Sequence, residues 1–193
     1  MNDSILDNLR ITRFGLFLAV LTVFFGFALG GAFGGLEEQI QGGLRESALA
    51  VRDTVYQGDD AKVQAVVGRG WTYFKRAHMH GGGIGTASLG LLLLLGVLRR
   101  PSPTVRALTG WALGLGGIGY SSFWLLAGRL APGMGGTSQA KEALRFLAFP
   151  SAGLLLLGVL SVLVVTAIEL FAKPKPAAED APIAPGAPSV GSR

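Results

Sequence analysis

The chain has 193 residues, half of them hydrophobic and only 15% charged, which is too apolar for an ordinary water-soluble domain. It has no cysteine, so disulfides, thiolate metal sites and iron–sulfur ligation are excluded. The formal charge of +5 comes from basic residues scattered near the ends of apolar segments, a pattern typical of membrane proteins that does not predict nucleic-acid binding.

The first predicted element is an apolar helix at about 14–35, preceded by a polar leader at 1–13. A run of about 18 or more apolar residues can cross about 30 Å of hydrocarbon as a helix. Small residues near the end of the run also fit a signal peptide cleaved within residues 1–30. We favour an uncleaved membrane helix, because three glycines have the spacing that lets a second helix approach closely: Gly26, Gly30 and Gly34.

Residues 36–75 are predicted to form a helical loop outside the membrane. Apolar residues recur at every third or fourth position from Leu36 to Val55, with charged residues between them, which is typical of an amphipathic helix. The pair Gly42-Gly43 predicts an interruption of this helix. Asp59 is then predicted to cap a short second helix over 61–67.

A second membrane span is predicted at about 76–98, after an aromatic and basic segment typical of a membrane–water interface. It can begin as early as Trp71, which would place the two histidines about two turns inside it. The third span is predicted at about 107–127. Each span has a face of small residues, which predicts close helix packing: Gly81, Gly85 and Ser88 in the second, and Gly110, Gly114, Gly117 and Ser121 in the third.

The fourth span is predicted at about 150–172, after a short interfacial helix over 138–149. Pro150 either begins this span or kinks a longer one. Residues 173–193 hold five of the nine prolines and are predicted to form a disordered tail. The predicted fold is therefore an all-α, four-transmembrane-helix bundle over 14–172, with an outward-facing helical loop between the first two helices.

The distribution of basic residues predicts that both termini are cytoplasmic. The short connection 99–106 carries three arginines and no acidic residue, as cytoplasmic connections commonly do. We therefore expect a multi-pass protein of the cell membrane, which would be the inner membrane in a bacterium. The basic residues that flank the first and last spans agree with this orientation: Arg10, Arg13, Lys173 and Lys175.

Few residues suggest catalysis or transport. There is no nucleophile–base arrangement and no nucleotide-binding glycine motif. Glu169 is the only acidic residue within the predicted spans, so the paired carboxylates typical of proton-coupled transport are missing. We expect Glu169 to reach the interface and to pair with Lys173 or Lys175.

The only two histidines, His78 and His80, are the candidate site for cofactor chemistry. A haem b held by two histidines of one chain is excluded, because its axial ligands come from both faces of the porphyrin and both histidines lie on one segment. Haem would need a different second ligand or a second subunit. If the segment is extended, both rings point the same way and can bind copper together with Met79 and Met134.

A quinone or an anionic lipid head is the third candidate ligand. Lys75, Arg76, one histidine and either Trp71 or Tyr73 would hold it at the interface. The histidines can also act without a ligand, as interfacial residues that stop the helix from sliding.

The function that we favour from the sequence is non-enzymatic. We expect an accessory or assembly subunit that lies in the lipid bilayer and packs against other membrane proteins or against itself. The alternative is a redox-linked membrane subunit that binds copper, haem or quinone at the outer face through His78 and His80.

Overall fold

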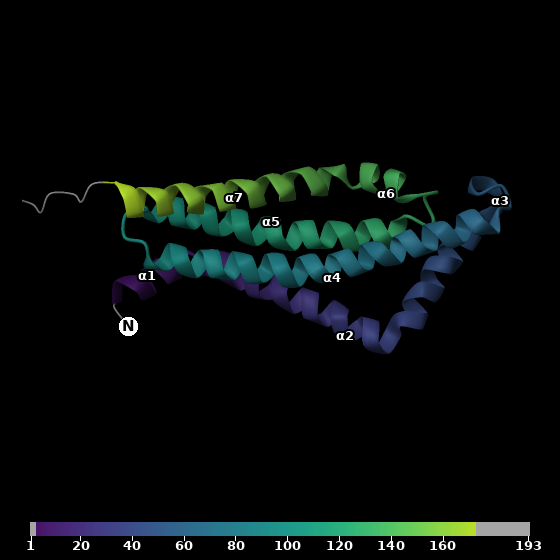
Figure 1. Ribbon diagram of the computed structural model, residues 1–193, viewed down its shortest axis with the longest axis horizontal. Helices are drawn as coiled ribbons and strands as arrows, with labels where there is room; N and C mark the ends of the chain where they lie inside the picture. The colour runs from purple at the N-terminus through teal and green to yellow at the C-terminus, as the bar shows by residue number, and fades with distance from the viewer. Residues whose placement is uncertain (1–2, 173–193) are drawn as a thin grey trace, which may run out of the picture.

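The computed structural model describes residues 3–172, and this part of the chain is helical with no strand. The predicted tail at 173–193 lies outside the described residues. Four long helices lie side by side (Figure 1): α2 (Arg13–Leu49), α4 (Asp60–Val97), α5 (Pro103–Leu130) and α7 (Arg145–Phe171). Three short helices complete the described fold: α1 (Asp3–Ile11), α3 (Arg52–Val55) and α6 (Thr137–Ala143).

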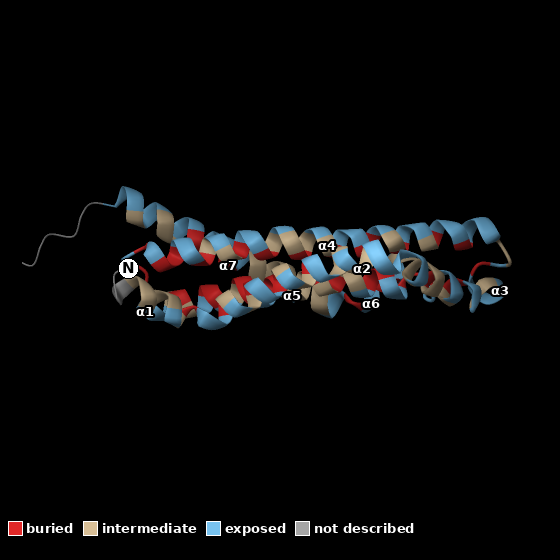
Figure 2. Ribbon diagram, turned by 90° about the horizontal axis from the view of Figure 1, so that it is seen from below, coloured by how far each residue is buried: buried red, intermediate tan, exposed pale blue. Residues whose placement is uncertain are grey.

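Three of the long helices, α2, α4 and α7, are long and apolar enough to cross a membrane. The fourth, α5, is not among them, because glycines and polar residues interrupt its apolar run. It packs against all three of the others and buries residues from Arg106 to Gly128, whereas α7 buries only Ser151, Gly158 and Val162. Buried residues gather where the helices meet (Figure 2). The long helix α5, which lacks a sufficiently apolar stretch of its own, is therefore well covered by its neighbours.

The helix α2 bends at Leu36, whose backbone angles are not helical (φ −129°, ψ 17°). Beyond the bend, α2 turns back toward the start of α4 (Figure 1) and continues to Leu49. The predicted interruption at Gly42-Gly43 is therefore wrong, because glycine inside a helix weakens it without ending it. The bend directly follows Gly34 and Gly35, and glycine pairs are common sites of helix kinks.

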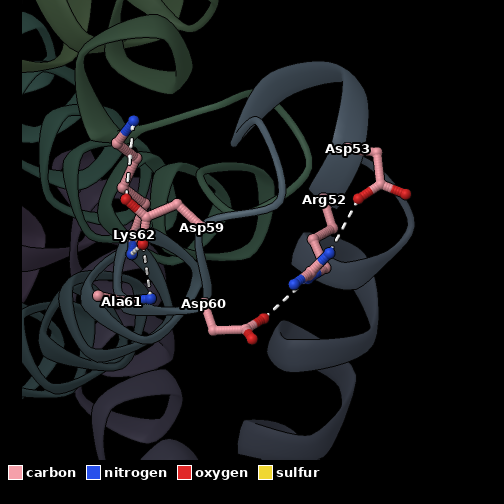
Figure 3. Close-up of polar contacts among 6 residues, drawn as sticks. All are labelled: Arg52, Asp53, Asp59, Asp60, Ala61 and Lys62. Carbon is pink, nitrogen blue, oxygen red and sulfur yellow. Dashed lines mark hydrogen bonds and ion pairs between the residues drawn. The ribbon is translucent and has the colours of Figure 1, made fainter.

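The helix α4 is continuous from Asp60 to Val97, so the separate short helix predicted at 61–67 is part of it. The predicted cap is confirmed: the Asp59 carboxylate accepts hydrogen bonds from the backbone N–H groups of Ala61 (2.9 Å) and Lys62 (3.1 Å), as Figure 3 shows. The helix also passes through both histidines and the three glycines that follow them.

The end of the bundle that holds α3 and α6 is called the cap end. There, Arg52 binds Asp53 (2.9 Å) and Asp60 (2.7 Å), as Figure 3 shows. The hydrogen bond from Arg52 to Asp60, followed by that to Asp53, raises the pKa of Arg52 above its ordinary value. The Tyr56 hydroxyl donates to the Pro132 carbonyl (2.5 Å). Six buried apolar residues form the core of this end: Ala48, Tyr56, Val63, Val66, Ala131 and Ala140.

The helix α7 begins at Arg145 and not at Pro150, and α6 ends at Ala143. The predicted boundary between the short helix and the last span is therefore misplaced. The two helices separate at Leu144, whose angles (φ −101°, ψ 11°) are not helical. Pro150 lies inside α7, one turn and a half from its start, so it removes one helical hydrogen bond without ending the helix.

Candidate functional site

Close contacts at glycines bring α4 against α2 in the segment that directly follows the two histidines. A Cβ added at Gly81 would lie 2.8 Å from the Cα of Gly26, and one added at Gly85 would lie 2.7 Å from the backbone nitrogen of Val23. Real Cβ atoms do not approach backbone so closely, so these positions require glycine. The predicted packing role of Gly26, Gly81 and Gly85 is confirmed, whereas Gly34 has no atom near its missing side chain.

His78 faces α2. Its Nδ1 lies 2.7 Å from the carbonyl oxygen of Gly26, and because a carbonyl only accepts, Nδ1 carries the hydrogen and donates it. Gly30 leaves room for the ring, since a Cβ there would lie 2.7 Å from Cε1 of His78. The Phe33 ring packs edge-on against both His78 (centroids 5.7 Å apart) and Trp71 (4.8 Å). His78 therefore ties α4 to α2.

His80 faces the other way, toward α5. Its ring lies 5.4 Å from that of Tyr120 and 5.8 Å from that of Trp124. Residues two apart on a helix differ by about 200° around its axis, so the two histidines share no face. The extended segment that binding of one ion by both would require is not formed.

The residues predicted to assist a metal are also spread apart. Met79 is 64% exposed on a third side of α4, and Met134 lies between α5 and α6. Within residues 3–172 no group of three or more His, Asp or Glu side chains is placed to hold a metal ion.

Five side chains between α4 and α5 form what we call the aromatic–cation cluster: Tyr73, Arg76, His80, Tyr120 and Trp124. The first three share one face of α4. The guanidinium of Arg76 lies 5.2 Å from the ring centre of Tyr73 and 5.0 Å from that of Trp124. The rings of Tyr73 and Trp124 themselves pack edge-on at 4.9 Å.

The structure thus divides the predicted binding residues into two groups. Tyr73, Arg76 and His80 come together, whereas Trp71 and His78 lie on the α2 side. Sequence reasoning missed Tyr120 and Trp124. Their spacing of four residues near the end of an apolar run was the signal that could have identified them.

The aromatic–cation cluster is rich in hydrogen-bond donors and poor in acceptors. The buried Nε1 of Trp124 finds no acceptor among the described residues. Arg76 is exposed, and no carboxylate in the described part of the chain forms an ion pair with it. The arrangement suits a ligand that brings oxygen acceptors.

The opposite end of the bundle, called the turn end, is held together by polar contacts to the α4–α5 turn. Arg106 is 1% exposed and donates to the carbonyls of Leu95, Leu98 and Pro101. Glu169 accepts from the backbone N–H groups of Arg99 (3.1 Å) and Arg100 (2.9 Å). Glu169 thus binds the turn, while its predicted partners Lys173 and Lys175 lie outside the described residues.

A cleft of about 800 Å³ separates the C-terminal part of α2 from the start of α4. It exists because α2 bends away at Leu36. Gly34, Gly35 and Gly42 line it with no atom within 4 Å of where a side chain would begin. Its charged lining residues are Glu37, Glu38, Arg45 and Asp60.

Comparisons with known proteins give no relative: no family model matches the chain, and neither a curated protein nor a solved structure is significantly similar to it. The function must therefore be inferred from the residues themselves.

Proposed function

We propose that this chain is a four-span integral membrane protein with a non-enzymatic role, an accessory or assembly subunit that packs against other membrane proteins. Both termini are cytoplasmic in this proposal, and the cap end faces outward. Large apolar side chains exposed on α2 and α7 support membrane insertion, because soluble monomers rarely leave so many uncovered: Phe14, Phe17, Phe24, Phe27, Leu156, Leu157, Leu160 and Leu163.

The helix α5 is the fourth span in this proposal. Its 28 residues extend about 42 Å, which exceeds the roughly 30 Å of the hydrocarbon core. Because the other three long helices pack around it, less of its surface meets lipid, so its lower apolarity is compatible with a position in the membrane.

The accessory role rests on one observation, the uncovered small-residue face of α4. Gly83, Ala87 and Gly90 are exposed, and no atom lies within 4 Å of a Cβ added at either glycine. The chain's own packing therefore does not require glycine there, in contrast to Gly81 and Gly85. Glycine inside a helix costs about 1 kcal/mol relative to alanine. Contact with a partner helix would offset that cost, since small residues allow close approach.

Site-specific photo-crosslinking in intact membranes tests the accessory role. A benzophenone amino acid at Gly83 or Gly90 is expected to yield a discrete adduct of fixed mass, because a partner helix covers this face. The same group at Leu157, which is 63% exposed on α7, is the control for a lipid-facing position. A diffuse or missing adduct at all three positions would contradict the accessory role.

Cysteine labelling tests the membrane placement, and the chain's lack of cysteine removes any background. Gly58→Cys is expected to react with a membrane-impermeant maleimide in intact cells, because Gly58 lies at the cap end. Ser102→Cys in the α4–α5 turn is expected to react only after permeabilisation. The reverse pattern, or labelling of both in intact cells, would refute the proposed orientation.

The alternative of a redox-linked subunit using both histidines for copper, haem or quinone is less well supported. The two rings lie on different sides of a continuous helix, and His78 already donates a hydrogen bond to Gly26.

A further inference from the structure

We propose that the aromatic–cation cluster binds the phosphate of a phospholipid headgroup in the outer leaflet. The inference rests on the proposed membrane placement and not on the accessory role. It assigns the ligand to the α4–α5 side of the bundle, with Arg76 as the residue that contacts the phosphate.

The guanidinium of Arg76 is held in place while its donors stay free. The rings of Tyr73 and Trp124 lie about 5 Å from it, which is the range of cation–π contacts. The two rings are nearly perpendicular (84°), so the guanidinium lies flat on at most one of them. No hydrogen bond to a described residue engages its N–H groups, which leaves them for an acceptor. These N–H groups match the geometry of phosphate oxygens, which arginine binds in bidentate fashion. The described residues supply no carboxylate that competes for them.

The depth of Arg76 agrees with the position of lipid phosphates. Arg76 lies 22 residues before Leu98, the C-cap of α4, and a helix of that length rises about 33 Å. If the α4–α5 turn lies at the inner surface, Arg76 stands just beyond the roughly 30 Å of hydrocarbon. His80 lies four residues closer to the hydrocarbon than Arg76, about 6 Å along the helix, at the depth where a phospholipid carries its ester oxygens.

Other outer basic residues do not share this arrangement. Arg145 pairs with Glu142 (2.8 Å). Arg129 donates to the Ser47 hydroxyl (3.0 Å). Arg69 is exposed on α4 seven residues before Arg76, about 10 Å farther out, with no aromatic ring stacked on it among the described contacts. Arg69 is therefore a matched control with the same charge and the same helix.

Native mass spectrometry of the full chain, purified in a mild detergent and titrated with phosphatidylglycerol, tests the proposal. The natural chain is expected to bind one lipid more tightly than any further ones. Arg76→Gln is expected to weaken that first binding about tenfold or more, because a charge-assisted hydrogen bond is lost. Arg76→Lys keeps the charge without the planar fork and should give an intermediate loss. Arg69→Gln should leave the affinity nearly unchanged.

Two further results would overturn the proposal. Equal weakening by Arg76→Gln and Arg69→Gln would indicate general attraction to anionic lipid and no site. Displacement of the bound phosphatidylglycerol by inorganic phosphate alone would assign the site to a free anion. Unchanged helical circular dichroism in each variant confirms that the fold is kept, and the maleimide labelling at Gly58 and Ser102 tests the membrane placement separately.

Discussion

Replacing Arg106 with leucine is expected to lower the free energy of unfolding by roughly 3–5 kcal/mol. Arg106 is almost completely buried and donates to three carbonyls at the end of α4 and in the turn that follows. The last carbonyls of a helix have no partner within the helix, so its side chain replaces the missing donors. Leucine would leave all three without that donor. The loss is measured by denaturant unfolding of the detergent-solubilised protein, followed by circular dichroism.

Arg99→Leu is the matched control for this prediction, because it removes the same charge from an exposed side chain in the same turn. Only the backbone N–H of Arg99 contacts Glu169, so that contact survives the substitution. The control is expected to change stability by no more than about 0.5 kcal/mol. Equal losses in the two variants would mean that net charge, and not the buried hydrogen bonds, stabilises the turn end.

Gly81→Ala is expected to destabilise the bundle by about 2–3 kcal/mol, although it adds a single methyl group. The new Cβ would lie 2.8 Å from the Cα and 2.9 Å from the nitrogen of Gly26, and backbone atoms cannot move aside as a flexible side chain can. The two helices would have to separate, which would also lengthen the hydrogen bond between His78 and Gly26. Thermal unfolding in detergent measures the effect.

Gly83→Ala adds the same methyl group two residues further along α4 and serves as the control. No atom lies within 4 Å of that methyl, so the isolated chain should be unchanged or stabilised by up to about 1 kcal/mol. Similar destabilisation by both variants would contradict the prediction, because only at position 81 does the added methyl meet the backbone of α2.

The sequence predicted the apolar part of each long helix, because length and apolarity are local properties of a run, but α2 and α4 extend beyond the spans predicted at 14–35 and 76–98. The glycine faces around Gly81 and Gly26 were also predictable, since spacing alone places residues on one side of a helix. The bend at Leu36 was not predictable. Glycine pairs stand both before it and after it, and each pair alone predicts a break in the helix equally well. The boundary before α7 was misplaced because proline tolerates an interior position once its neighbours satisfy the backbone.

The candidate site was predictable only in part. The pattern identified the residues of α4 but could not say which neighbour each would face, because the rotation of a helix is set by packing. The sequence therefore suggested that His78 and His80 act as a pair, whereas in the fold His78 contacts α2 and His80 contacts α5. Tyr120 and Trp124 join the cluster across 40 or more residues of sequence, a distance over which no local pattern carries information.

The contact between Glu169 and the α4–α5 turn sets an order of assembly during synthesis. Its two hydrogen bonds join residues about 70 positions apart, so the N–H groups of Arg99 and Arg100 have this partner only after α7 is made. Arg106 acts much earlier, because it follows the carbonyls that it binds by no more than 11 residues. The α4–α5 turn can therefore form its hydrogen bonds to Arg106 first and those to Glu169 last. This order makes α7 the element that completes the bundle.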